Sequence, residues 1–149
     1  RAARRAVPAG TWPVLAVIAG GGVVGALARY EIQLGLPHRP DGFPWSTFLV
    51  NITGCLLIGA LMVLIVEVWS GPRLLRPFLG VGVLGGYTTF STYALDIQQA
   101  VTAAAAATAL LYLAATLLGA LFAVWAGAAL TTRTVRWLRR ASDSQEGEQ

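Results

Sequence analysis

The sequence predicts an all-α membrane protein, a single domain over residues 1–149 in which four helices cross the bilayer and the third is interrupted near its middle. Three observations lead to this fold. Of the 149 residues, 56% are hydrophobic and only 12% are charged, whereas about 25% is usual in a water-soluble domain. The apolar residues fall into four runs close to the roughly 20 residues that a helix needs to cross about 30 Å of hydrocarbon. The third run contains a cluster of glycines and hydroxyl residues that does not suit a lipid-facing helix.

We therefore expect spans at about 13–30, 46–69, 75–98 and 101–130, with a polar tail at 141–149 that frays. Backbone polar groups in lipid must be bonded internally, so the choice lies between helices and a closed barrel. Barrel strands alternate apolar and polar residues, and these runs do not, which favours helices.

The first span, 13–30, is rich in glycine. Gly21 and Gly25 have the small-xxx-small spacing that lets two helix backbones approach closely in lipid. Arg29 at its end either reaches the headgroups or anchors a polar network. Arg1, Arg4 and Arg5 before the run are similar to the start of a secretory signal, but the glycine pattern favours a span that is retained.

The connection between the first two spans, 34–44, contains three prolines and two glycines and is predicted to be exposed. His38 lies in it beside Arg39 and Asp41, so we expect a solvated histidine rather than a metal ligand or a proton relay. The second span places Asn51 in its N-terminal half. Cys55 in the same span is expected to be a small packing residue.

The third span is the most informative one. Four glycines, each about 1 kcal/mol worse than Ala in a helix interior, precede four hydroxyl residues at mid-membrane depth. The glycines are Gly80, Gly82, Gly85 and Gly86, and the hydroxyl residues are Thr88, Thr89, Ser91 and Thr92. Irregular backbone at this depth is tolerated where it is buried in protein or lines a cavity. We expect a break within 85–92; the alternative is a glycine-packed helix whose hydroxyls bond its own carbonyls.

The fourth span follows with almost no loop. Tyr112, Thr116 and Gly119 lie at i, i+4 and i+7 and therefore share one helix face. We expect this face to point inward, away from lipid.

The polar groups available inside the spans favour anion passage over proton exchange. No Asp or Glu lies at mid-depth before Asp96, and there is no lysine, whereas proton-coupled pumps usually need such a carboxylate. Hydrogen-bond donors are present instead: the Asn51 amide, several hydroxyls and opened backbone. The electropositive ring edges of Phe90 and Tyr93 can flank a small anion. Dehydrating an anion requires such closely placed donors.

The arginines give the spans a direction. In a four-span chain the termini and the second connection share one side of the membrane. That side carries nine of the eleven arginines: Arg1, Arg4, Arg5, Arg73, Arg76, Arg133, Arg136, Arg139 and Arg140. Arg29 and Arg39 belong to the other side. The positive-inside rule places both termini in the cytoplasm.

Four motifs, one in each span and in the same order, resemble the CrcB/Fluc family of fluoride channels. They read Gly21-Gly22-x-x-Gly25-Ala26-x-x-Arg29-Tyr30, Asn51-Ile52-x-Gly54, Gly85-Gly86-Tyr87-Thr88-Thr89-Phe90-Ser91-Thr92 and Tyr112-x-x-x-Thr116-x-x-Gly119. The Thr88–Thr92 core is the most specific of them. The resemblance implies an antiparallel dual-topology dimer in the cell membrane, with two fluoride pores and a structural sodium ion at its centre.

The same resemblance assigns roles to individual residues. Gly85 and Thr88 would bind sodium through backbone carbonyls, and Arg29 would support the pore mouth or the local structure. Fluoride would pass Asn51, Phe90, Ser91, Thr92, Tyr93, Tyr112 and Thr116. Tyr93 departs from the family, in which a second phenylalanine usually stands at this position, and its hydroxyl needs a partner if it is buried.

Two further hypotheses remain beside fluoride export. A small four-helix proton-coupled multidrug exporter would need a carboxylate inside the first span, and a non-transporting assembly subunit would not explain the hydroxyl cluster. No nucleophile–base pair or metal cluster points to an enzyme. A dual-topology chain should show almost no arginine bias. We therefore expect this chain to insert in one orientation and to pair with an oppositely oriented homologue, with an antiparallel homodimer as the alternative.

Overall fold

The computed structural model describes residues 11–68 and 71–146, and within these ranges the chain is helical and contains no strand. The elements are α1 (Thr11–Gly35), α2 (Trp45–Glu67), η1 (Pro77–Val83), α3 (Leu84–Tyr87), α4 (Phe90–Thr102) and α5 (Ala106–Glu146). Three of them, α1, α2 and α5, are long and apolar enough to cross a membrane. The chain is therefore a multi-pass membrane protein.

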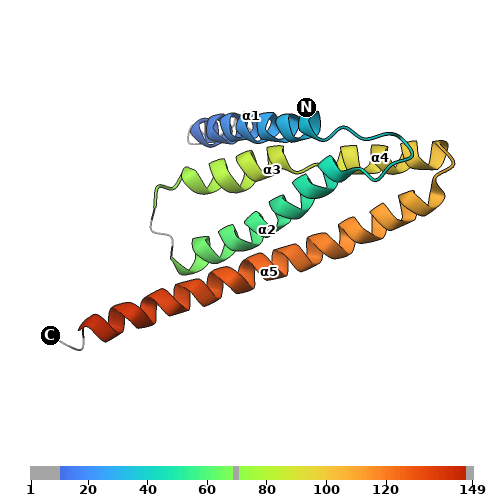
Figure 1. Ribbon diagram of the computed structural model, residues 1–149. Helices are drawn as coiled ribbons and strands as arrows, with labels where there is room; N and C mark the ends of the chain where they lie inside the picture. The colour runs from blue at the N-terminus through green and yellow to red at the C-terminus, as the bar shows by residue number, and fades with distance from the viewer. Residues whose placement is uncertain (1–10, 69–70, 147–149) are drawn as a thin grey trace, which may run out of the picture.

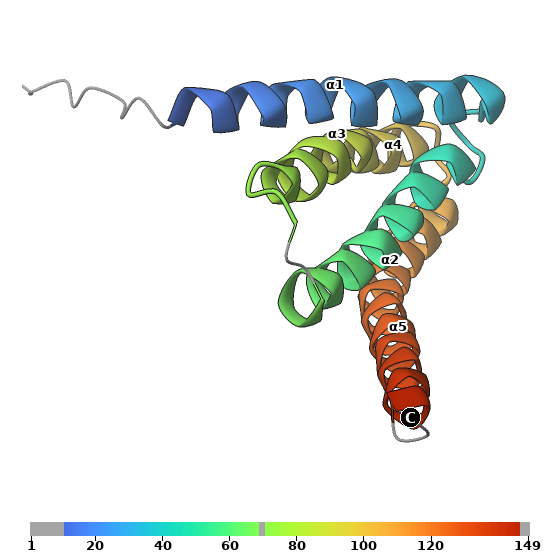
Figure 2. The same cartoon turned by 90° about the vertical axis from the view of Figure 1, so that its left-hand side faces the viewer.

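The helices form layers around the broken segment. Figures 1 and 2 show α1 lying over the α3 half of the broken segment, with α2 and α5 on the opposite side. The two halves of the broken segment have different main neighbours, since η1 and α3 pack on α1 whereas α4 packs on α5. The other large interface joins α2 to α5.

Glycine allows α1 to approach the broken segment closely. Gly21 and Gly25 are buried in α1. A methyl group on Gly25 would overlap the Val83 carbonyl, and one on Gly86 of α3 would overlap the Gly22 carbonyl. Backbone therefore lies directly against backbone at this interface, as the spacing of Gly21 and Gly25 predicts.

Two more glycines serve the α2–α5 interface. A methyl group on Gly59 would overlap the Val124 carbonyl, and one on Gly127 would overlap the Leu56 carbonyl. The predicted inward face of the last helix is confirmed, because Tyr112 and Thr116 are both buried.

The chain breaks between α3 and α4. η1 is wound in wide π-type turns, in which the Leu84 N–H bonds to the Leu79 carbonyl five residues back. α3 then ends at Tyr87, and Thr88 (ψ 157°) and Thr89 (φ −149°, ψ 124°) are extended before α4 begins at Phe90. The interruption expected within 85–92 thus lies at Thr88 and Thr89.

Several helices have other bounds than the predicted spans. α1 continues to Gly35 rather than ending near 30, so the connection is shorter than 34–44. α5 begins at Ala106 rather than 101, after a turn in which Ala104 adopts φ 59°, and it continues as helix through the polar tail to Glu146. At 41 residues it measures about 60 Å, twice the hydrocarbon thickness. Arg1, Arg4 and Arg5, and the predicted end of the second span at 69, lie outside the described residues.

Candidate functional site

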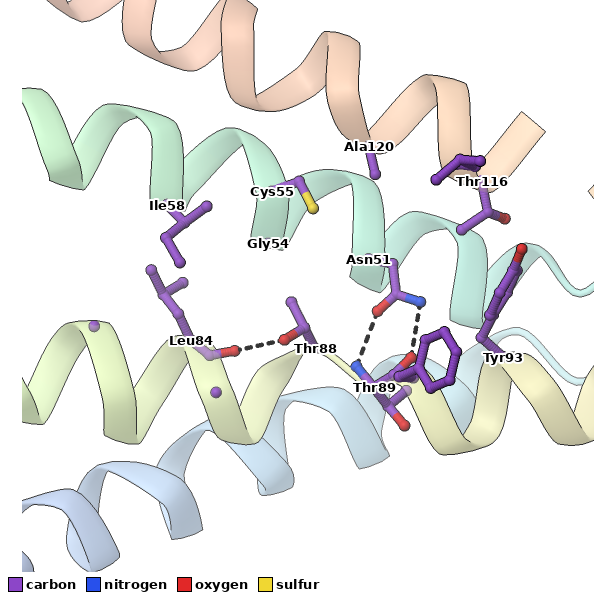
Figure 3. A pocket seen from close by; sticks show the side chains of 14 residues that line it. Asn51, Gly54, Cys55, Ile58, Leu84, Thr88, Thr89, Tyr93, Thr116 and Ala120 are labelled. Atoms are coloured by element: carbon purple, nitrogen blue, oxygen red, sulfur yellow. Dashed lines mark hydrogen bonds between the residues drawn. The ribbon is translucent and has the colours of Figure 1, made fainter. Parts of the chain in front are cut away.

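Asn51 joins α2 to the helix break through two hydrogen bonds. Its side-chain Nδ2 donates to the Thr89 carbonyl at 3.0 Å, and its Oδ1 accepts from the Thr89 N–H at 2.9 Å (Figure 3). The amide therefore bonds to both backbone groups of the extended Thr89 and replaces the helical bond that its N–H has lost. One N–H of the amide group remains for another acceptor, because a side-chain amide has two donor hydrogens.

Thr89 also begins α4. Its Oγ1 accepts from the Thr92 N–H at 3.2 Å and donates to the Thr92 Oγ1 at 3.0 Å, as an N-cap threonine does. Ser91 Oγ lies 3.4 Å from the same oxygen. Three of the four clustered hydroxyls thus organise the helix start. The fourth, Thr88 Oγ1, donates to the Leu84 carbonyl at 3.0 Å. The alternative interpretation, in which the hydroxyls bond to carbonyls of their own helix, therefore describes Thr88.

The break leaves two carbonyls without their usual helical donors. The Thr89 N–H, which would bond to the Gly85 carbonyl in a continuous helix, bonds to Asn51 instead. The Thr92 N–H, which would bond to the Thr88 carbonyl, bonds to the Thr89 hydroxyl.

Arg29 is a partner of one of these two carbonyls. Its guanidinium donates to the Thr88 carbonyl at 3.2 Å from the facing helix α1. Arg29 therefore anchors a polar network, which is the second of its two interpretations, rather than only reaching the headgroups. A carbonyl oxygen has two lone pairs, so the Thr88 oxygen can still accept one more partner.

A pocket of about 350 Å³ opens beside the break. Its lining includes the polar residues Asn51, Thr88, Thr89, Tyr93 and Thr116, and most of the lining surface is apolar (Figure 3). The Thr116 Oγ1 is buried there without a hydrogen-bond partner. Within its lining there is no Asp, Glu, Lys, Arg or His. The pocket therefore offers neutral hydrogen-bonding groups in an apolar surround and no fixed charge.

Aromatic rings extend from the pocket toward the α1–α2 connection. The Phe90 and Tyr93 centroids lie 5.8 Å apart, and those of Tyr93 and Tyr112 lie 5.2 Å apart. Tyr112 in turn meets Phe43 edge-on at 5.3 Å. The Tyr93 hydroxyl donates to the Leu113 carbonyl of α5 at 3.1 Å. That bond supplies the partner that a tyrosine at this position requires.

A second polar cluster lies at the far end of this row of rings. Asp96 is 5% exposed, and its Oδ2 accepts from the Tyr112 hydroxyl at 3.4 Å. Its Oδ1 lies 3.7 Å from His38 Nε2. His38 is open to solvent, as expected, and its side chain, 23% exposed, also lies beside the carboxylate. Neither residue was among the predicted site residues, although a carboxylate one helical turn after Tyr93 is a sign of a functional position in a membrane helix.

The structure brings some predicted site residues together and separates others. Those that line the pocket are Asn51, Gly85, Thr88, Phe90, Tyr93 and Thr116. Ser91, Thr92 and Tyr112 lie outside its lining, the first two at the start of α4 and the third between the pocket and Asp96. Among the residues described, no group of three or more His, Cys, Asp or Glu could hold a metal ion. Cys55 is a free thiol on the pocket wall.

A profile of the family described as CrcB-like protein, Camphor Resistance (CrcB), matches residues 16–128, which is more than half of the chain. The chain belongs to the CrcB family. It is 57% identical over 116 residues to Fluoride-specific ion channel FluC 2 of Streptomyces avermitilis, an alignment that covers 78% of this chain and 73% of that protein. Identity to Fluoride-specific ion channel FluC 1 of Streptomyces coelicolor is 53% over 125 residues, with 84% and 81% covered.

A third relative in the CrcB family covers still more of the chain. Fluoride-specific ion channel FluC 2 of Nocardia farcinica is 51% identical over 129 residues, with 87% of this chain and 89% of that protein aligned. The region that matches the CrcB profile contains the helix break, the pocket and the Asp96 cluster. It stops at residue 128, so the arginine-rich end of α5 lies beyond it.

Proposed function

We propose that this chain forms a fluoride-selective channel that lets cytoplasmic fluoride leave the cell passively and so lowers its toxicity. One observation carries this proposal. In a member of the CrcB family, a pocket beside a broken helix presents the Asn51 amide and the free Thr116 hydroxyl and has no charged side chain in its lining. Such a pocket can replace the water of a small anion by hydrogen-bond donors.

Several different groups would bind the anion. The Asn51 amide, held by Thr89, keeps one N–H for the anion, and the Thr116 hydroxyl is free to donate. The ring edges of Phe90 and Tyr93 carry partial positive charge and complete the surround. Because the Tyr93 hydroxyl is bonded to Leu113, the ring itself is held beside the pathway. From there the route continues along Tyr112.

We also propose a dimer of antiparallel subunits with two pores. Phe90 is 80% exposed in the single chain although it begins a helix at the break, and Val81 of η1 is also exposed. A second subunit that covers this surface would bury Phe90 and close the pocket.

The opened backbone fits a sodium ion at the centre of that dimer. The carbonyls of Gly85 and Thr88 have lost their helical donors, and broken membrane helices coordinate sodium through such unwound carbonyls. When bound, sodium supplies positive charge that holds the two breaks together. One chain provides only these two oxygens, which accounts for a site shared by two subunits.

The proposed orientation has both termini in the cytoplasm. The Arg139 guanidinium donates to the Glu67 carbonyl, so the end of α5 and the α2–η1 connection lie at the same end of the protein. This end carries Arg73, Arg76, Arg133, Arg136, Arg139 and Arg140. Arginine at that density favours the cytoplasmic side.

Fluoride efflux from liposomes tests the channel and its partner together. The full chain is reconstituted alone, and in parallel with an oppositely oriented homologue. Because of the arginine bias we expect rapid efflux only from the mixture. Efflux from the chain alone would establish homodimers and contradict the need for a partner, and no fluoride efflux from either preparation would contradict the channel itself.

Phe90→Ile is expected to slow fluoride efflux at least tenfold in whichever preparation conducts. Isoleucine retains bulk and apolar character but has no electropositive edge, so the anion loses one of its few partners in a dehydrated pore. The matched control is Phe122→Ile, because Phe122 is an exposed ring on α5 away from the pocket. Normal turnover of Phe90→Ile would remove the ring edge from the mechanism.

A further inference from the structure

The buried carboxylate of Asp96 is not explained by anion passage. It lies against the Tyr112 hydroxyl, on the route proposed for fluoride, and a negative charge there repels the anion. Its other oxygen, Oδ1, lies 3.7 Å from His38 Nε2. We propose that His38 and Asp96 form a proton-sensitive charge pair that sets the rate of fluoride passage past Tyr112. This inference rests on the proposed function.

The α1–α2 connection is built to hold His38 in this position. Phe43, five residues after His38, packs edge-on against Tyr112, and Pro44 is fully buried. Figure 1 shows the connection running alongside α4, the helix that carries Asp96. A loop anchored in this way holds the imidazole beside the carboxylate while His38 stays open to solvent.

The surroundings leave His38 as the one partner with a variable charge in physiological conditions. Tyr112 bonds to the carboxylate from α5, and Tyr93 of α4 contacts the Tyr112 ring. Both are phenols, which stay neutral near pH 7. Thr47 of α2 is uncharged and 1% exposed. In the connection itself Arg39 pairs with Asp41 at 3.2 Å, and the two charges offset each other.

The sign of the effect follows from the charges. With an ionised carboxylate and a neutral imidazole, the pair carries one negative charge beside the pathway. Histidine is the side-chain type whose charge ordinarily changes in the physiological pH range, and a protonated imidazole leaves the pair with no net charge. Acid therefore removes the repulsion, and fluoride passes faster. The response suits a fluoride exporter, because hydrogen fluoride enters a cell more readily from acid surroundings.

The test is the fluoride current across a planar bilayer at symmetric pH 8 and pH 5.5. Current is the suitable measurement because neutral hydrogen fluoride crosses lipid but carries no charge. For the unmodified channel, in the subunit combination that conducts, we expect the current to rise about threefold or more on acidification, as removal of one nearby charge predicts.

Two variants separate the partners. His38→Gln keeps the negative charge at both pH values, so its current should stay at the low alkaline level and lose its pH dependence. Asp96→Asn removes the negative charge, so its current at pH 8 should exceed that of the unmodified channel. Asp41→Asn is the matched control from the same connection, since its carboxylate is exposed, and it should keep the normal pH response.

The outcomes separate this inference from the proposed function. No fluoride current from the unmodified protein at either pH contradicts the channel. A current that does not change with pH, or a His38→Gln variant that keeps the rise, overturns the charge pair while leaving the channel intact. If Asp96→Asn does not give a monodisperse protein in detergent, the His38→Gln result decides alone.

Discussion

Asn51→Asp should abolish fluoride efflux. The substitution keeps the shape of the side chain but places a negative charge in the pocket and removes the donor that bonds to the Thr89 carbonyl at 3.0 Å. At about 4 Å and an effective dielectric constant of about 20, repulsion between the carboxylate and fluoride is about 4 kcal/mol. A barrier raised by that amount slows passage about a thousandfold. Efflux from liposomes measures the loss.

Asn51→Ala is the matched control for the charge. It also loses the bonds to Thr89 but adds no negative group, so it should conduct slowly rather than not at all. Size-exclusion chromatography in detergent establishes that both variants assemble. Efflux from Asn51→Asp at the unmodified rate would exclude Asn51 from the pore, and equal loss in both variants would show that its capping of the break matters more than the charge.

Gly25→Leu should prevent normal assembly of α1 with the broken segment. A side chain at Gly25 has no room, because even its first carbon would overlap the Val83 carbonyl. Backbone cannot move aside as a flexible side chain would, and overpacking of this kind costs about 3 kcal/mol. We expect a lower yield of monodisperse protein and a clearly lower unfolding temperature in detergent, whatever the transported ion.

Gly20→Leu is the control for this change. Gly20 lies in the same helix, and the first side-chain carbon there would meet no atom within 4 Å. The two substitutions add the same apolar group to the same helix, so only the interface distinguishes them. Equal stability of the two variants would contradict the close contact between α1 and η1.

The helix break illustrates what local composition can predict. Gly85, Gly86 and the hydroxyls after them disfavour a helix through their own backbone and side-chain chemistry, so the interruption could be located from the sequence. The hydrogen bonds that complete the break could not be predicted from local sequence. Asn51 is 38 residues away from Thr89, and only the packing of α2 on the broken segment brings its amide to both backbone groups.

His38 illustrates the opposite case. A histidine between prolines in a polar connection is ordinarily solvated, and nothing nearby in the sequence indicates a buried carboxylate 58 residues later. The Phe43 ring packs against Tyr112 and Pro44 is buried, and a connection held in this way places His38 beside Asp96. The alanines before α5 show the same limit of local sequence. The fourth span was expected from 101, but Ala104 forms a turn at φ 59° in spite of the high helix propensity of alanine.

The sequence by itself determined that this chain is a helical membrane protein, that Gly21 and Gly25 of its first helix make close contacts, and where the third span breaks. These properties follow from requirements met within one segment: enough apolar length for the bilayer, internal bonding of the backbone, and residues that tolerate or disfavour a helix. Only the tertiary structure decided which groups complete the break and which stay free. Asn51, Arg29 and Asp96 find their partners on other helices, because a polar group buried in lipid must be satisfied across an interface that local sequence does not specify.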